Sequence, residues 1–282
     1  MGLFKNEVGR PSNETIKKRN IFKGICFVLV LIIIGLVCYI FKDDIKIFNT
    51  GNKTSDGNNK VTTTLNKEEK TNKDTNNKYV ITYETEEYSK ENIKNTRLIA
   101  TVKNEANQEA ADKIQKTLRE TLEENWREIK ENTDDFAGKT DEKLGVDIKI
   151  KTLKVTDKYL SFDDSIMGSF GGVVWSSVGG LMFDAKTGDK VSLNDISTNS
   201  DELNKVIYQF GIDYLNKENH CLMDDWKSNL LTLISNNWNL DDNGFNIYIS
   251  KYDVACGADG SKIINVPYSK INDYLKDEYK NK

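Results

Sequence analysis

The sequence predicts an α+β protein with a mainly antiparallel sheet and packed helices, preceded by one N-terminal transmembrane helix and a disordered stalk. Three observations support this prediction: an uncharged apolar run near the N-terminus, a polar tract behind it, and a remainder in which alternating apolar residues are mixed with helical spacing. The expected segments are a basic cytoplasmic head (1–23), the membrane helix (24–41), the stalk (42–78), an N-terminal α+β subdomain (79–165) and a C-terminal α+β domain (166–282).

The apolar run from Gly24 to Phe41 contains no charged residue. At about 1.5 Å per residue it spans about 27 Å, close to the roughly 30 Å of a bilayer core. It ends in Tyr39-Ile40-Phe41-Lys42 without a small-residue cleavage site, which favours an uncleaved anchor over a signal peptide. Basic residues are more numerous before the run than after it, so we expect a single-pass cell-membrane protein with a cytoplasmic N-terminus and an extracellular C-terminal part. The basic residues that precede the run are Lys5, Arg10, Lys17, Lys18, Arg19 and Lys23.

The chain as a whole is close to neutral, with 40 Lys+Arg against 44 Asp+Glu and a net charge of −4, which argues against a nucleic-acid-binding protein. The head contains Gly9-Arg10-Pro11, which resembles a minor-groove hook, but Val8 stands where such hooks carry a second arginine. A helix start at Pro11, with Lys17–Lys23 as an electrostatic anchor at the inner leaflet, is the preferred interpretation.

The tract 49–78 is rich in Asn, Lys and Thr and contains almost no apolar residues. It cannot bury enough apolar surface to offset the entropy that is lost on ordering, so a flexible stalk is expected.

Patterned sequence begins at Tyr79. Apolar residues recur every three or four positions from Ala106 to Ile129, which predicts one long amphipathic helix. Asp201 is expected to cap a second helix, Ser269 a closing helix, and Asp241–Gly244 to form a hairpin turn. The other expected elements are strands around 79–83, 98–102, 146–150, 160–162, 173–178, 181–183, 238–240, 245–249 and 264–266, a turn at 186–189 and a helix at 226–233.

Few residues suggest catalysis. The single histidine, His220, lies beside Cys221, and adjacent residues usually point apart, so a loop histidine is favoured over a His-Cys dyad. No zinc-ligand, nucleophile or phosphate-loop motif is present, and carboxylates such as Asp163 and Asp164 do not follow a calcium-loop spacing. The sequence therefore predicts no enzyme activity, no metal and no cofactor.

The four cysteines fall into two pairs. Cys26 and Cys38 lie within the apolar run and are interpreted as small apolar residues. Cys221 and Cys256 lie in the part expected to be exported, where a disulfide can form and persist. A Cys221–Cys256 disulfide is the prediction, with two buried free thiols as the alternative.

Two stretches near the C-terminus resemble a known family. Gly179–Ile196 reads GGLMFDAKTGDKVSLNDI, and Asn243–Ile249 is followed by Tyr252–Ala255, Gly257–Gly260 and Val266–Tyr268. These stretches resemble the extracytoplasmic domain of the anti-sigma-V factors, which sense lysozyme, and a domain of unknown function that precedes polysaccharide deacetylases. Tyr79–Phe162 resembles its companion subdomain. Members often carry Gly-Gly-Ala-His-Pro where this chain reads Gly171-Gly172-Val173-Val174-Trp175.

The resemblance implies a non-enzymatic binding or sensing protein of a Gram-positive-type cell envelope, whose partner is a lysozyme-like protein or peptidoglycan. The alternatives are an anti-sigma factor that holds a sigma factor through residues 1–23 and is released by intramembrane proteolysis, and a cell-wall-modifying or binding accessory protein. Tyr252, Asp253 and Asp259 are the candidate ligand contacts. Trp175 is a weaker candidate, for which core packing is preferred.

Overall fold

The computed structural model describes residues 60–64, 69–71, 78–139, 141–170, 173–217 and 220–281. The predicted head and membrane helix lie outside these ranges, so neither is tested. Within them, no helix combines the length and apolar character that crossing a bilayer requires.

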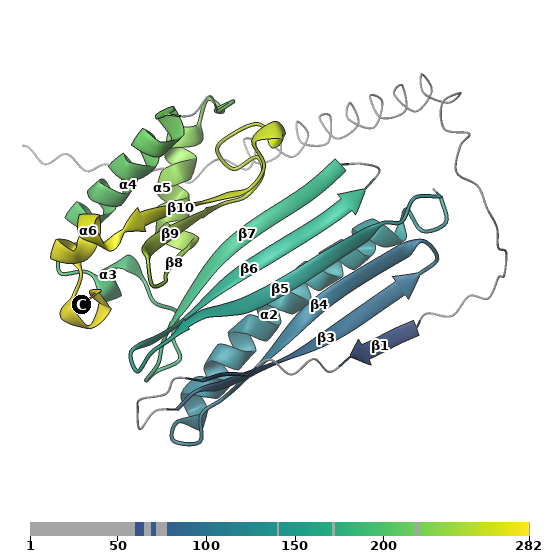
Figure 1. The fold of residues 1–282 in the computed structure, drawn as a ribbon, viewed down its shortest axis with the longest axis horizontal. Coiled ribbons are helices and arrows are strands. Elements are labelled where there is room, and N and C mark those ends of the chain that lie inside the picture. Colours follow the sequence, from purple (N-terminus) through teal and green to yellow (C-terminus); the bar gives the residue numbers. More distant parts are fainter. Residues whose placement is uncertain are drawn as a thin grey trace, which may run out of the picture. The chain divides into compact units, whose positions relative to one another are not determined.

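Seven strands form the larger sheet, in the order β1-β3-β4-β5-β6-β7, with β2 also paired to β3 (Figure 1). Every pairing is antiparallel except that of β4 with β5, which are parallel and joined by the long helix α2 (Gln108–Asp134). The strands are β1 (Lys60–Thr64), β2 (Glu69–Thr71), β3 (Val80–Lys90), β4 (Ile93–Lys103), β5 (Gly145–Val155), β6 (Tyr159–Phe170) and β7 (Val173–Asp184). The α+β prediction with a mainly antiparallel sheet is confirmed.

Strands β1 and β2 correct part of the stalk prediction, and the rest of residues 42–78, apart from Lys78, lies outside the described ranges. Both lie in the segment expected to be an unstructured stalk, yet both pair with β3. The stalk was predicted from its lack of apolar residues that could be buried, which leaves out backbone pairing with another strand. A strand added to a sheet edge gains backbone hydrogen bonds whatever its side chains, and the β-branched run Val61–Thr64 favours extended backbone.

Helix α2 covers one face of the larger sheet (Figure 1). Side chains alternate along β5, so that Val146, Ile148 and Ile150 are at most 1% exposed beneath the helix. Helical spacing brings Ile114, Leu118 and Leu122 onto the facing side of α2. The long helix predicted from apolar spacing is therefore confirmed, and it begins after Asn107, whose side chain accepts from the Ala110 amide.

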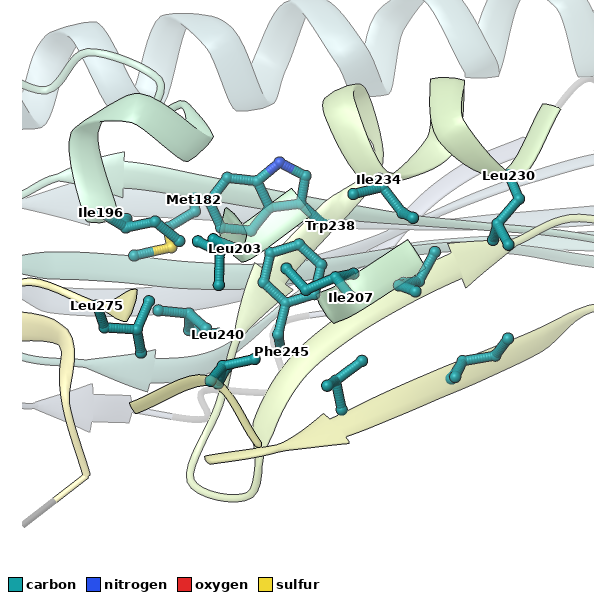
Figure 2. Packing of buried hydrophobic residues seen from close by; sticks show 14 of the residues in the cluster. Met182, Ile196, Leu203, Ile207, Leu230, Ile234, Trp238, Leu240, Phe245 and Leu275 are labelled. Atoms are coloured by element: carbon teal, nitrogen blue, oxygen red, sulfur yellow. The ribbon is translucent and has the colours of Figure 1, made fainter. Parts of the chain in front are cut away.

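The C-terminal part builds a second sheet with its own core. Strands β8 (Trp238–Leu240), β9 (Gly244–Ile249) and β10 (Lys262–Pro267) are antiparallel, in the order β10-β9-β8. Helices α4 (Ser200–Lys217) and α5 (Trp226–Asn236) pack on them, with Leu203 and Ile207 from α4 and Ile234 from α5 buried around Trp238 and Phe245 (Figure 2). The rings of Trp238 and Phe245 are stacked at 4.8 Å. Shorter elements complete this part: α3 (Leu193–Ile196), α6 (Tyr268–Ile271) and the 3₁₀ turns Gly257–Asp259, Asn272–Tyr274 and Asp277–Tyr279.

Both predicted helix caps are wrong. Helix α4 begins at Ser200, and the Asn199 side chain accepts from the Glu202 amide, so Asp201 lies within the first turn. Helix α6 begins after Pro267 and places Ser269 inside the helix. In each case another residue near the predicted start already occupies the position before the first helical residue. The hairpin predicted at Asp241–Gly244 is confirmed, with the Asp241 carboxylate accepting from the amides of Asn243 and Gly244.

Two strands were predicted at 173–178 and 181–183, but β7 is continuous. Gly179 and Gly180, between the two predicted strands, lie inside it. A Cβ atom on Gly180 would lie 2.6 Å from the Trp238 backbone and from the Tyr248 ring. Glycine is needed there so that the second sheet can approach the first. The predicted boundary between residues 165 and 166 falls inside β6, which pairs along its whole length with β7.

The outer edge of β7 hydrogen-bonds with side chains of the second sheet. Asn237 Oδ1 accepts from Gly180 N at 3.0 Å, and its Nδ2 donates to Val178 O at 3.2 Å and to Tyr248 O at 3.0 Å. Ser250 Oγ accepts from Val178 N at 2.9 Å and lies 3.1 Å from Val178 O. These groups occupy positions that a further strand would otherwise take.

The same edge continues toward the β6–β7 turn with two more donors. Ser261 Oγ donates to Ser176 O at 2.9 Å, and Lys251 Nζ donates to Val174 O at 3.0 Å. Together with Asn237 and Ser250 they form the β7-edge contact. It fixes the second sheet, and the connection from β9 to β10, against the first.

We expect Asn237→Ala to lower the free energy of unfolding by about 2–4 kcal/mol, because it leaves the Gly180 amide and the Tyr248 carbonyl without their side-chain partner. The matched control is Asn236→Ala. Asn236 is exposed and bonds only within its own helix, to Thr232 O, so its replacement should change stability by less than about 0.5 kcal/mol. Urea unfolding measures both, and equal effects would show that the β7-edge contact is not a stabilising interaction.

Candidate functional site

The three predicted ligand-contact residues lie in one segment, the β9–β10 loop, which we define as Ser250–Ser261. The loop is bound on one side to β7 through Ser250, Lys251 and Ser261, as described above. On the other side it pairs with the segment that joins α4 to α5. The structure brings Tyr252, Asp253 and Asp259 together in the loop and gives them different roles.

Asp253 builds the loop from inside. Its Oδ2 accepts from the Ser250 amide at 2.7 Å, and its backbone carbonyl accepts from Asn229 Nδ2, on α5, at 2.7 Å. Burial raises the pKa of Asp253, while the hydrogen bond from Ser250 lowers it. Asp253 therefore has a structural role in the loop, and its role as a ligand contact stays a prediction.

Tyr252 is displayed by the loop. Its backbone has φ +71°, which a residue with a side chain rarely adopts, and its side chain is 61% exposed. Among the described residues it is the most exposed of the large apolar side chains. The Tyr252 hydroxyl lies beside Gly257, where a Cβ atom would be only 2.3 Å away, and Lys251 Nζ lies 5.6 Å from the ring centroid. The ring therefore has a defined position although it faces solvent.

The segment 220–223 pairs with the loop as a short antiparallel ladder. Leu222 and Ala255 form a bridge, Cys256 N donates to Cys221 O at 2.7 Å, and Met223 N donates to Val254 O at 3.0 Å. Val254 is fully buried. On this side the loop is therefore held by main-chain hydrogen bonds together with the Asn229 side chain, and on the β7 side by side chains.

Asp259 is held by two cationic or ionisable groups. Its Oδ2 lies 2.8 Å from His220 Nδ1 and 3.4 Å from Lys262 Nζ, and the three side chains are between 9% and 14% exposed. Burial raises the pKa of Asp259, but the charge of Lys262 and the interactions with His220 outweigh it, so the pKa lies below its ordinary value. The predicted ligand contact Asp259 thus secures the end of the loop to residue 220.

His220 lies in a loop, as the sequence suggested, but it has more contacts than the one with Asp259. Its ring also stacks on Tyr214, at the end of α4, with centroids 6.4 Å apart. Lys262 Nζ lies 3.0 Å from its Nδ1. Sequence inspection missed Lys262 and Tyr214 because their only relation to His220 is spatial.

Cys221 and Cys256 are directly opposite in the ladder, and both are present as thiols. The hydrogen bond from Cys221 lowers the pKa of Cys256, and the amides of Ala258 and Asp259 lower it further. The same thiol–thiol contact raises the pKa of Cys221. The spatial pairing of the two residues is what a disulfide needs, and the bond itself stays a prediction.

The carboxylates of β6 do not form an active-site pair. Asp163 and Asp164 are consecutive in a strand, so they project to opposite faces of the sheet. Asp164 lies under α2, where Asn125 Nδ2 donates to it at 3.3 Å, and burial raises its pKa to about 6. Across the described ranges, no three His, Cys, Asp or Glu residues are grouped so that they could hold a metal ion.

No family model matches the sequence, and neither does any curated protein. Among solved structures, the chain is similar to a DUF3298 family protein from Pseudomonas aeruginosa, with 14% identity and a TM-score of 0.47 over 79% of this chain and 98% of that one. It is also similar to a member of the DUF3298 family from Bacteroides fragilis, with 13% identity and a TM-score of 0.45 over 78% of this chain and 96% of that one. These structural neighbours belong to a domain-of-unknown-function family, and the link to anti-sigma-V factors or deacetylases stays a prediction.

We expect Asp164→Asn to stabilise the protein above the folded-state pKa of about 6. Burial disfavours the ionised carboxylate, so its penalty is absent below the unfolded-state pKa, grows as pH rises from that value to the folded-state pKa, and is complete above it. The gain should reach about 1–3 kcal/mol at pH 7.5 and vanish near pH 3.5. The control is Asp157→Asn. Asp157 is exposed and lies in the turn between β5 and β6, so its replacement should change stability by less than about 0.5 kcal/mol. Thermal unfolding across this pH range provides the measurement, and a pH-independent gain would contradict the assignment.

Proposed function

We propose that the described part of the chain is a non-enzymatic binding or sensing domain, held outside the cell by the predicted membrane helix, and that the β9–β10 loop contacts its ligand. The observation that carries this proposal is Tyr252, whose backbone has φ +71° and which is 61% exposed. Holding a residue other than glycine in the left-handed region costs about 1–3 kcal/mol. An exposed ring gives little packing in return, so the strain supports a role in recognition.

The neighbouring surface suits a binding role. Met167 and Val174 are 57% and 58% exposed, and the β6–β7 register makes them diagonal neighbours on one face of the sheet. Lys251 connects this end of the sheet to the loop, since its Nζ donates to Val174 O and lies over the Tyr252 ring. We call Tyr252, Val174 and Met167 the Tyr252 surface. Tyrosine offers a large amphipathic contact with few rotatable bonds, which favours its use in binding surfaces.

The ligand classes follow from the resemblance: a lysozyme-like protein or a peptidoglycan fragment. The alternatives remain an anti-sigma factor, in which residues 1–23 hold a sigma factor, and a cell-wall-modifying accessory protein. A sigma factor that binds a peptide of residues 1–23 would favour the former. The side chain of Trp175 is not among those that the structure describes, so its candidate role is untested.

We expect Tyr252→Gly to weaken ligand binding at least tenfold while leaving the melting temperature unchanged or higher. Glycine adopts φ +71° without strain, so this variant removes the ring and keeps the loop. The full chain, in a mild detergent, is titrated with a panel of lysozymes and with purified peptidoglycan fragments by calorimetry.

The matched control is Leu153→Ala. Leu153 is 38% exposed and lies near the end of β5 that leads into the β5–β6 turn, whereas Met167 and Val174 lie near the β6–β7 turn. It should leave affinity within about twofold of the parent chain. Binding that is unchanged in Tyr252→Gly would contradict the Tyr252 surface as the contact. Absence of heat with every lysozyme and every glycan would contradict both ligand classes.

A further inference from the structure

The cysteine pair is placed for chemistry as well as for structure. Cys221 is exposed and Cys256 half-buried, so a small molecule can reach the pair from solvent. The backbone hydrogen bond from Cys256 N to Cys221 O, beside the Leu222–Ala255 bridge, holds the two residues opposite each other. Residues opposite each other in an antiparallel pair have Cβ atoms about 4.5–5.5 Å apart, close to the separation that a disulfide requires, so little movement is needed to form the bond.

The two thiols are not equivalent. Cys256 is stabilised as the thiolate by the Cys221 thiol and by the amides of Ala258 and Asp259, so its pKa lies below its ordinary value, while that of Cys221 lies above. A thiolate is the attacking species in thiol–disulfide exchange. The arrangement therefore supplies an attacking cysteine and a second cysteine beside it that can resolve the mixed disulfide.

We propose that Cys221 and Cys256 form a reversible thiol–disulfide exchange site for small-molecule disulfides, and that its oxidation locks the β9–β10 loop to the 220–223 segment. The locking deepens the proposed function, on which its consequence for ligand binding rests. The exchange chemistry stands on the cysteine pair itself and does not depend on the proposed function.

The exchange proceeds in two displacements. The Cys256 thiolate attacks one sulfur of a disulfide R–S–S–R, which forms a Cys256–S–R bond and releases RS⁻, and the latter takes a proton from water. Cys221 then loses its proton to water and attacks Cys256 Sγ, which forms the Cys221–Cys256 bond and releases the second RS⁻. Two protein thiols lose two electrons in total, and R–S–S–R is reduced to two thiols. An excess of the reduced thiol reverses both steps.

Oxidation acts on the loop that carries Tyr252. In the reduced protein the ladder at this side consists of two backbone hydrogen bonds and one bridge. A covalent bond between residues 221 and 256 prevents this short ladder from opening, and Tyr252 is four residues away from Cys256 along the loop. The oxidised protein should therefore hold the Tyr252 surface in place more firmly than the reduced one.

The first experiment measures the exchange. The full chain in detergent is equilibrated with reduced and oxidised glutathione at several ratios, acid-quenched, alkylated and peptide-mapped, which separates this pair from Cys26 and Cys38. We expect Cys221 and Cys256 to lose their thiols together and to regain them in millimolar reduced glutathione. Thiols that persist at every ratio, or a bond that millimolar glutathione leaves intact, would overturn the reversible site.

Single variants test the assigned order of attack. Cys221→Ser keeps a hydroxyl donor beside Cys256, and Cys256→Ser leaves only the more exposed Cys221. We expect the Cys221→Ser chain to form its mixed disulfide with oxidised glutathione about threefold or more faster at pH 7, because thiolate fraction outweighs exposure. Equal rates, or faster reaction of Cys221, would overturn the order.

Amide hydrogen exchange of the parent chain tests the locking without any ligand. The amides of residues 250–261 should exchange at least about threefold more slowly in the oxidised than in the reduced chain, and Cys221→Ser should match the reduced chain under both conditions. Identical exchange in the two states would overturn the locking. Failure of ligand binding in the calorimetric experiment leaves these readouts unaffected, so the two proposals fail separately.

Discussion

The arrangement of the second sheet depends on the outer edge of β7. An edge strand carries a row of backbone donors and acceptors that need partners. Here Asn237 and Ser250 bond the Val178 and Gly180 positions, while Ser261 and Lys251 bond the carbonyls of Ser176 and Val174. Three of these four side chains belong to the β9–β10 loop as defined above, so a single set of contacts protects the sheet edge and positions the loop. Gly180 permits this approach because a Cβ atom there would meet the Tyr248 ring.

A row of asparagines strengthens the same junction. Three asparagines lie opposite one another on neighbouring strands: Asn239 on β8, Asn246 on β9 and Asn265 on β10. Asn265 Nδ2 donates to Asn246 Oδ1, and Asn246 Nδ2 donates to Asn239 Oδ1. Asn239 also donates to the Phe162 carbonyl of β6 at 2.7 Å, which ties the row to the first sheet. Both sheets are fixed, and the β9–β10 loop is anchored on two sides. These anchors hold Tyr252 in its left-handed backbone conformation. A rigid support of this kind is what allows a loop to present one side chain in a defined position.

Local patterns predicted the elements whose formation depends on their own sequence. Apolar spacing identified α2, alternation identified β5, and Asp241–Gly244 identified the hairpin, because periodicity and turn chemistry are read within a few residues. Strands β1 and β2 were missed, since pairing with β3 is a distant event that their composition does not reveal. The roles of Asn237, Asp259 and Lys262 were missed for the same reason. The sequence placed the three candidate ligand contacts close together, and their role in binding stays a prediction. It could not separate Tyr252, which is displayed, from Asp253 and Asp259, which hold the loop together.

The most direct test of this account is residue-resolved amide hydrogen exchange at Val178 and Gly180. On an open sheet edge these outward-facing amides would exchange at the rate of an unprotected peptide. In this structure each has a side-chain acceptor: Ser250 Oγ at 2.9 Å for Val178 and Asn237 Oδ1 at 3.0 Å for Gly180. We expect both amides to be protected to a degree comparable with the inward-facing amides of β7. Exchange of either amide at the rate of an unprotected peptide would contradict the β7-edge contact, and with it the fixed position of the β9–β10 loop.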